Sequence, residues 1–122
     1  MTDFIIVYIT ATDADQARRI GRALIDDRLA ACVNIIGGMQ SIYRWDGRIV
    51  EDAEAVLIAK TRARLFDALA AKTKQLHTYG TPCIVAYPIL NGAPEYLDWL
   101  AAQTAPVAAS TIEAPRPRGE GQ

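Results

Sequence analysis

Three residues in the chain carry side chains that bind soft metal ions. Cys32 and Cys83 are the two cysteines, and His77 is the one histidine. Thiolate sulfur and imidazole nitrogen favour Cu(I) and Zn(II) over hard cations. The cysteines do not form a CxxC or another short ligand spacing, so the fold would have to bring the ligands together. The alternative is that both cysteines are small buried apolar residues and that His77 interacts with the last carbonyls of a helix.

A second set of residues is aromatic and cationic, and it consists of Tyr43, Arg44, Trp45, Lys60 and Tyr79. In a monomer, Trp45 would expose a large apolar surface, which favours packing against another subunit. The same residues could also form a cleft between subunits for a small anion or metabolite, because ligand sites often lie at interfaces. The two interpretations are compatible.

Composition and motifs argue against several classes of function. The chain has no GxSxG motif, HExxH motif or glycine-rich phosphate loop, and its one histidine excludes a multi-histidine metal centre, so we do not expect an enzyme. A net charge of -1 and 22% charged residues argue against a nucleic-acid or anionic-membrane partner. Two cysteines without a disulfide framework, and no recognisable signal peptide or membrane span, predict a cytoplasmic protein.

The aromatic and cationic residues flank a predicted β-hairpin that spans Met39 to Lys60. Asp46-Gly47 favours the tight two-residue turn between its arms, and Gly37-Gly38 predicts a bend or bulge just before them. The tip of the hairpin is polar, whereas residues 55–59 are apolar and predict a buried base. At about 3.3 Å per residue, such arms extend beyond the roughly 13 Å radius of gyration of a domain this size. The hairpin therefore predicts an oligomer.

The remaining elements place this hairpin in a fold. Strands are predicted over 4–10, 29–36 and 83–89, with the last at a sheet edge because of Pro88. One helix begins at an Asp13 cap, to which Gln16 three residues later can return the hydrogen bond, another begins at a Thr61 cap, and a short helix follows over 95–100. This βαββαβ order predicts an α+β, ferredoxin-like sandwich with a protruding hairpin and a C-terminal helix.

Two further expectations follow from this fold. The chain is predicted to form a single domain over residues 1–103, followed by a flexible tail over 104–122, which is rich in Ala, Pro, Ser and Thr. The second and fourth strands of a ferredoxin-like sheet occupy opposite edges. Cys32 and Cys83 would therefore meet only across an interface between subunits. One face of the sheet is expected to be apolar and uncovered, which again favours an oligomer.

Four stretches resemble the CutA family of divalent-cation tolerance proteins: RLAACVNI (28–35), SIYRWDGRI with EDAE and LIAKTR (41–62), LHTYGTP (76–82) and YLDWL (96–100). The resemblance extends to about residue 104. It implies a homotrimer of ferredoxin-like subunits whose hairpins wrap their neighbours, with a likeness to PII signalling proteins. It also implies a non-enzymatic, metal-binding role in tolerance of copper or other divalent metal ions, with no required cofactor. The alternative is a PII-like sensor that binds a small metabolite at the intersubunit cleft.

The chain departs from the family pattern at three positions. Thr78 replaces a proline, and Gly80 and Cys83 replace glutamates. The loss of two carboxylates disfavours hard ions such as Mg²⁺ and Ca²⁺, whereas Cys83 near His77 favours soft metals. The resemblance implies that Cys32 is a metal-binding thiol. It also implies an intersubunit cleft formed by Tyr43, Trp45, Lys60, His77 and Tyr79.

Overall fold

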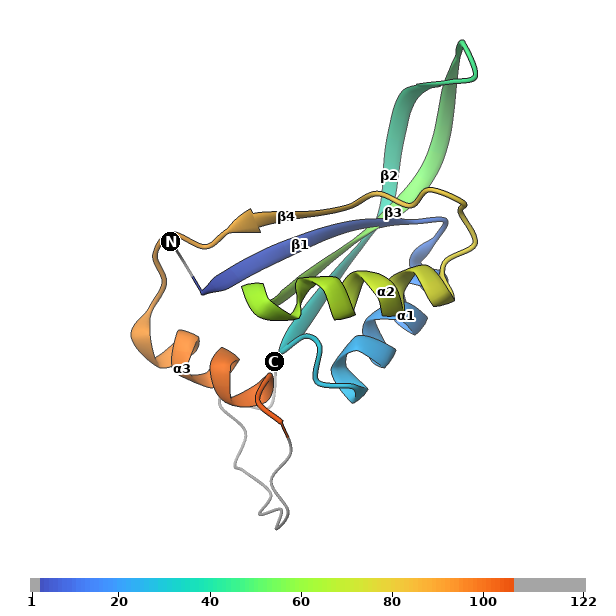
Figure 1. Cartoon of the computed structure of the whole chain (residues 1–122). Coiled ribbons are helices and arrows are strands. Elements are labelled where there is room, and N and C mark those ends of the chain that lie inside the picture. Colours follow the sequence, from blue (N-terminus) through green and yellow to red (C-terminus); the bar gives the residue numbers. More distant parts are fainter. Residues whose placement is uncertain (1–2, 107–122) are drawn as a thin grey trace.

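The computed structural model describes residues 3–106 (Figure 1). The elements in chain order are β1 (Phe4–Ala11), α1 (Ala14–Asp26), β2 (Cys32–Trp45), β3 (Arg48–Arg62), a 3-10 turn (Ala63–Leu65), α2 (Phe66–Leu76), β4 (Ile84–Pro88) and α3 (Pro94–Gln103). This confirms the predicted α+β, ferredoxin-like βαββαβ fold with a C-terminal helix. Most of the tail predicted over 104–122 lies outside the described residues.

The four strands form one antiparallel sheet in the order β2-β3-β1-β4. β4 lies at one edge, as Pro88 predicted, and β2 lies at the other. Two strands therefore separate Cys32, at the start of β2, from Cys83, which immediately precedes β4. The prediction that the cysteines lie at opposite edges of one chain is confirmed.

β2 and β3 form a long hairpin that protrudes from the rest of the molecule (Figure 1). Asp46 and Gly47 occupy its turn with φ angles of 53° and 73°, as expected for the turn that Asp-Gly favours. The register shifts between Ile36 and Met39, so Gly37-Gly38 forms the predicted irregularity within a continuous strand. Residues 29–31, which were predicted to begin this strand, precede it.

The core lies between the sheet and the two helices α1 and α2. Alternate residues of β1 face this core, and residues 55, 57 and 59 of the hairpin base are fully buried. Gly21 of α1 allows close packing, because a Cβ atom there would lie 3.0 Å from Val33 Cγ2 and 3.3 Å from Leu57 Cδ1. The N-terminus of α1 is capped by Asp13, whose carboxylate accepts a hydrogen bond from the backbone N–H of Gln16 at 2.8 Å.

Thr61 does not cap α2, contrary to the prediction from sequence. It belongs to β3, pairs with Ile5 and is fully buried. Its hydroxyl has no hydrogen-bond partner among the described residues. β3 continues to Arg62, and a 3-10 turn then leads into α2, whose N-terminus has no side-chain cap. The pairing with β1 therefore extends the strand past the point where the local sequence favours a helix start.

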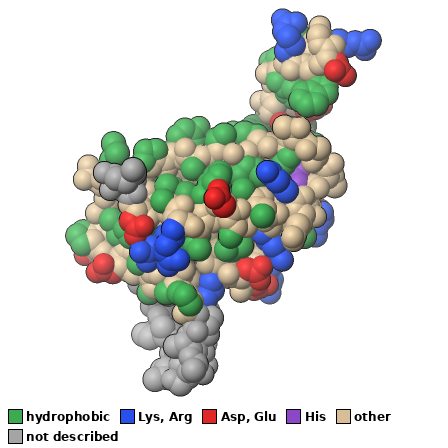
Figure 2. All heavy atoms as spheres, in the orientation of Figure 1, with side chains coloured by type: hydrophobic (Ala, Val, Ile, Leu, Met, Phe, Trp, Pro, Cys, Tyr) green, Lys and Arg blue, Asp and Glu red, His purple; other side chains and the backbone are tan. Residues whose placement is uncertain are grey.

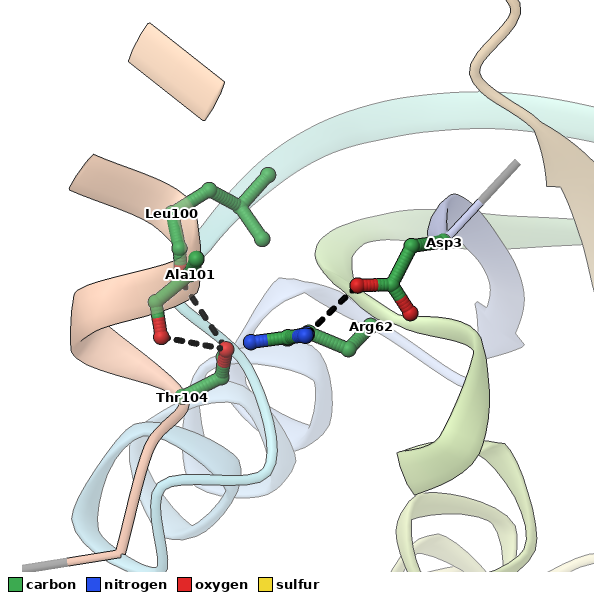
Figure 3. A network of polar contacts seen from close by, with 5 residues as sticks. All are labelled: Asp3, Arg62, Leu100, Ala101 and Thr104. Carbon is green, nitrogen blue, oxygen red and sulfur yellow. Dashed lines mark hydrogen bonds and ion pairs between the residues drawn. The ribbon is translucent and has the colours of Figure 1, made fainter. Parts of the chain in front are cut away.

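α3 packs near the beginning of β1 and the end of β3 (Figure 1). Arg62 forms an ion pair with Asp3 at 2.6 Å and points toward the C-terminal end of α3 (Figure 3). Thr104 closes that end by donating its hydroxyl hydrogen bond to the carbonyl of Leu100 at 2.9 Å (Figure 3). The C-terminal end of α3 is therefore closed by its C-cap residue Thr104, beside Arg62 of β3 (Figure 3).

The face of the sheet opposite α1 and α2 carries exposed apolar side chains, as predicted. Ile36 is 54% exposed and Tyr87 is 55% exposed. On the hairpin, Trp45 is 57% exposed. Figure 2 shows basic and acidic side chains at the far end of the hairpin and hydrophobic side chains just below them. A single chain therefore leaves apolar surface uncovered both on its sheet and along its hairpin.

Candidate functional site

The loop between α2 and β4 is fastened to the end of β1. The ring of His77 contacts the carbonyl oxygen of Thr10 through Nε2 at 2.7 Å. The backbone N–H of Thr10 donates to the carbonyl of Cys83 at 3.3 Å. Gln16 of α1 donates from its side-chain amide to the hydroxyl of Thr78 at 3.0 Å. These bonds hold the loop beside the place where the hairpin leaves the sheet.

His77 uses both ring nitrogens within this loop. Nδ1 accepts a hydrogen bond from the backbone N–H of Tyr79 at 3.1 Å, so Nε2 carries the proton and donates to Thr10. The rings of His77 and Tyr79 are also in contact, with centroids 4.6 Å apart. Neither nitrogen of the neutral ring has a free lone pair in this arrangement. His77 therefore positions Tyr79, and metal coordination would require it to give up one of these bonds.

A cavity of about 700 Å³ lies between this loop and the hairpin. This volume falls within the range of small-molecule binding sites. The cavity is lined by residues of β1, the hairpin and the loop: Thr10, Ser41, Ile42, Tyr43, Trp45, Glu54, Thr78, Tyr79, Gly80, Thr81 and Cys83. Three residues of the predicted cleft, Tyr43, Trp45 and Tyr79, are therefore brought together in one chain.

Two carboxylates beside the cavity hold its phenol groups. Tyr79 donates its hydroxyl hydrogen bond to Glu54 Oε2 at 2.7 Å, and Tyr43 donates to Asp52. Burial, and then the bond to Glu54, raise the pKa of Tyr79 well above its ordinary value. The bond to Asp52 is the main cause that raises the pKa of Tyr43. Both phenols therefore remain neutral hydrogen-bond donors at physiological pH.

Sequence reasoning did not identify Glu54 or Asp52 as site residues. Glu54 is 7% exposed, although it carries a charged group, and it immediately precedes the apolar run of the hairpin base. Asp52 and Glu54 alternate with residues of the opposite face, so both project to the side of the sheet that carries Tyr43 and Trp45. Two features of the sequence could have identified this pair. Glu54 begins the buried run of the hairpin base, and both carboxylates occupy every second position of the strand, on the face that carries the aromatic residues.

Lys60 does not join the other predicted cleft residues within one chain. Its ammonium group donates to Asn34 Oδ1 at 3.1 Å and lies 5.8 Å from the centre of the Tyr96 ring. Lys60 pairs with Cys32 at the base of the hairpin, whereas Trp45 pairs with Arg48 near the tip. Along β3, these positions are separated by roughly 40 Å at about 3.3 Å per residue.

The three predicted metal ligands are distributed over two places. Cys32 is paired with Lys60 at one sheet edge, whereas Cys83 lines the cavity near the loop held by His77. Within residues 3–106, no group of three or more His, Cys, Asp and Glu side chains could hold a metal ion. Burial, and then the charge of Glu54, raise the pKa of the Cys83 thiol. Metal binding by Cys83 would therefore have to displace a proton.

Comparison with known proteins identifies the family of this chain. Residues 5–103 match the family described as CutA1 divalent ion tolerance protein. The chain belongs to this family. Of the curated relatives, the divalent-cation tolerance protein CutA of Thermus thermophilus is 50% identical over 99 residues, which cover 81% of this chain and 96% of the relative. The chloroplastic protein CutA 1 of rice is 43% identical over 100 residues, which cover 82% of this chain but 56% of the relative.

Solved CutA structures share the fold of this chain. The divalent cation tolerance protein of Thermus thermophilus superimposes with a TM-score of 0.82 at 49% identity. The match covers 84% of this chain and 99% of that structure. No helix in the described part of the chain is long and apolar enough to cross a membrane. The predicted cytoplasmic location stays a prediction, since the rice relative is named as chloroplastic.

The positions where this CutA chain departs from the expected family pattern lie in the loop beside the cavity. Thr78 accepts the hydrogen bond from Gln16, a role that a proline could not fill. A Cβ atom at Gly80 would meet nothing within 4 Å, so the cavity has room for a side chain there. Gly80 and Cys83 both line the cavity, which makes it less acidic than the expected pattern would.

Proposed function

We propose that this CutA chain is a non-enzymatic homotrimer that takes part in the response to copper or another soft metal ion. The observation that carries this proposal is the uncovered sheet face. The strand order of the same sheet places Cys32 at one edge and Cys83 beside the other. An interface that joins opposite edges of neighbouring copies brings these two thiols together. A cyclic trimer repeats this contact three times and leaves no edge free.

The apolar surface supports the assembly half of this proposal. The sheet face and the hairpin each expose large apolar side chains that water solvates poorly, and Trp45 is the largest of them. A hairpin that extends past its own core can cover the sheet face of a neighbouring copy. Light scattering on the purified protein is expected to give the mass of three chains, and a monomer would refute the proposed assembly.

The chemistry of the thiols supports the metal half. Two thiolates from neighbouring copies suit a cuprous ion, which prefers sulfur ligands. Anaerobic competition titration of Cu(I) against bicinchoninate tests this proposal. We expect the wild type to compete for copper, and Cys32→Ser and Cys83→Ser each to lose that ability. Because each thiol must lose its proton, copper affinity should increase with pH. Unchanged copper stoichiometry in both variants would exclude these ligands.

A second candidate function is metabolite sensing, in the manner that the likeness to PII proteins implies. The cavity beside Tyr43, Trp45 and Tyr79 favours it, because it has the volume of a ligand site and lies between two separate segments of the chain. A thermal-shift screen with nucleotides, small acids and small amines tests it. An increase in the unfolding temperature with one of these classes is expected, and no change with any of them would exclude this candidate.

A further inference from the structure

The cavity between the hairpin and the loop combines aromatic walls with a buried negative charge. Tyr43, Trp45 and Tyr79 supply three aromatic rings, and Glu54 supplies the carboxylate. Among residues 3–106, neither lysine nor arginine lines it. Aromatic faces attract cations electrostatically, whereas they offer nothing to phosphate or carboxylate groups. The lining therefore selects against the anionic ligand that the sequence suggested for this cleft.

Glu54 is the polar centre of the cavity. The residue is only 7% exposed, and its Oε2 atom accepts the hydrogen bond from Tyr79 at 2.7 Å. Among the described residues, no cationic group forms an ion pair with this carboxylate, and its other oxygen receives no hydrogen bond. A carboxylate in such surroundings is stabilised by a positive charge that enters the cavity.

A second negative charge lies next to the first on the same side of the hairpin. Asp52 accepts the hydrogen bond from Tyr43, and strand alternation places it beside Glu54. The cations of the hairpin arms, Arg44, Arg48 and Lys60, are not among the lining residues. Arg48 pairs across from Trp45 near the hairpin tip, and Lys60 binds Asn34 at the base. Two carboxylates, Glu54 and Asp52, therefore lie at the cavity, and neither lysine nor arginine is among its described lining residues.

We propose that this cavity binds a small organic cation with a primary ammonium or guanidinium head group. The head group donates hydrogen bonds to the free oxygen of Glu54, and the rings of Tyr43, Trp45 and Tyr79 surround its charge and its alkyl chain. This inference rests on the metabolite-binding role given above as the second candidate function and specifies the class of ligand. The observations that support it do not involve copper.

The test compares four probes of similar size that differ in charge. Isothermal titration calorimetry of the full-length protein is carried out with butylamine, butylguanidine, 1-butanol and butyrate at fixed pH and ionic strength. We expect the two cations to bind and the neutral and anionic probes not to bind. Binding of butanol or butyrate as tightly as butylamine would overturn the proposal, and so would the absence of binding by both cations.

Variants then identify the cavity as the site. Glu54→Gln retains an acceptor for Tyr79 but removes the charge, so cation affinity should decrease at least about tenfold. Glu51→Gln is the matched control, because Glu51 is exposed on the other face of the same strand and should leave affinity unchanged. Gly80 has an ordinary backbone conformation and open space around it, so Gly80→Glu should tighten cation binding and Gly80→Lys should weaken it.

The outcomes separate this inference from the proposed functions. The site is refuted if Glu54→Gln binds the cations as tightly as the wild type and if Gly80→Glu and Gly80→Lys do not change the affinity in opposite directions. The cations would then bind elsewhere. Light scattering and the Cu(I) titration on the same preparation report the trimer and the copper site independently. A trimer that binds copper but no amine would refute the cation site alone, whereas a monomer that binds amines would refute the assembly alone.

Discussion

Replacement of His77 tests whether this residue is a structural anchor or a metal ligand. His77→Ala removes the hydrogen bond to the Thr10 carbonyl, the bond from the Tyr79 N–H and the ring contact with Tyr79. Each neutral hydrogen bond contributes about 0.5–1.5 kcal/mol, and an aromatic contact contributes a similar amount. We therefore expect the free energy of unfolding to decrease by about 2–4 kcal/mol.

The measurement is chemical denaturation followed by far-UV circular dichroism. All variants are compared at one protein concentration, because oligomerisation makes apparent stability depend on concentration. Gln75→Ala is the matched control: Gln75 is exposed in the last turn of the same helix and should change stability by less than about 0.5 kcal/mol. His77→Gln retains a donor and an acceptor and should lose less stability than His77→Ala.

Copper binding decides between the two roles of His77. If the residue is an anchor, the folded His77→Gln protein keeps the copper stoichiometry of the wild type in the bicinchoninate titration. The reasoning is refuted if His77→Ala retains full stability while the titration shows the loss of a copper site. That result would mean that the ring gives up its bonds to Thr10 and Tyr79 when metal is present.

Three further predictions concern stability. Thr61→Val replaces a buried hydroxyl that has no partner in the described chain with a methyl group of similar size, so the free energy of unfolding should increase by about 1 kcal/mol in denaturation experiments. Gly47→Ala forces a Cβ onto a residue with a φ of 73°, so it should cost about 1 kcal/mol or more and weaken the proposed trimer in light scattering at low concentration. The raised pKa of Tyr79 means that the folded protein favours the neutral phenol. The stability that this phenol contributes is complete below its ordinary pKa of 10.0 and is lost as pH increases beyond that value. Wild type should therefore lose more stability than Tyr79→Phe between about pH 9 and pH 11, and equal losses would contradict this account.

Local turn chemistry made the hairpin and the topology predictable. Asp46-Gly47 favours one class of turn, and both residues adopt the positive φ angles that this turn requires. Gly21 lies on the sheet-facing side of α1, where an added Cβ atom would lie 3.0 Å from Val33 Cγ2. These features depend on residues that are close in sequence or repeat with the period of a helix.

Local patterns were insufficient where partners distant in sequence decide the structure. Thr61 is a good helix cap by local criteria, but its pairing with Ile5 keeps it in the strand. The resemblance places Lys60 and Trp45 in one intersubunit cleft, and the length of the arms puts them at opposite ends of a single hairpin, so only a neighbouring subunit could bring them together. The role of His77 depends on Thr10, which lies 67 positions away in the chain. No local pattern contains that information.

The distance between the two candidate sites limits how they can act together. Cys32 and Lys60 lie at the base of the hairpin, whereas the cavity lies where the hairpin leaves the sheet, with Cys83 in its wall. In one chain, a metal at Cys32 cannot touch the cavity. In the proposed trimer, a metal that joins Cys32 of one subunit to Cys83 of the next would lie against the wall of the second subunit's cavity. Copper binding replaces two thiol protons with one cuprous ion, so the occupied dithiolate site carries a net negative charge. A bound organic cation is attracted by that charge, so each ligand should strengthen the affinity for the other by the same factor. Copper titrations with and without saturating butylamine measure that factor, and its absence would mean that the thiols do not meet at the cavity.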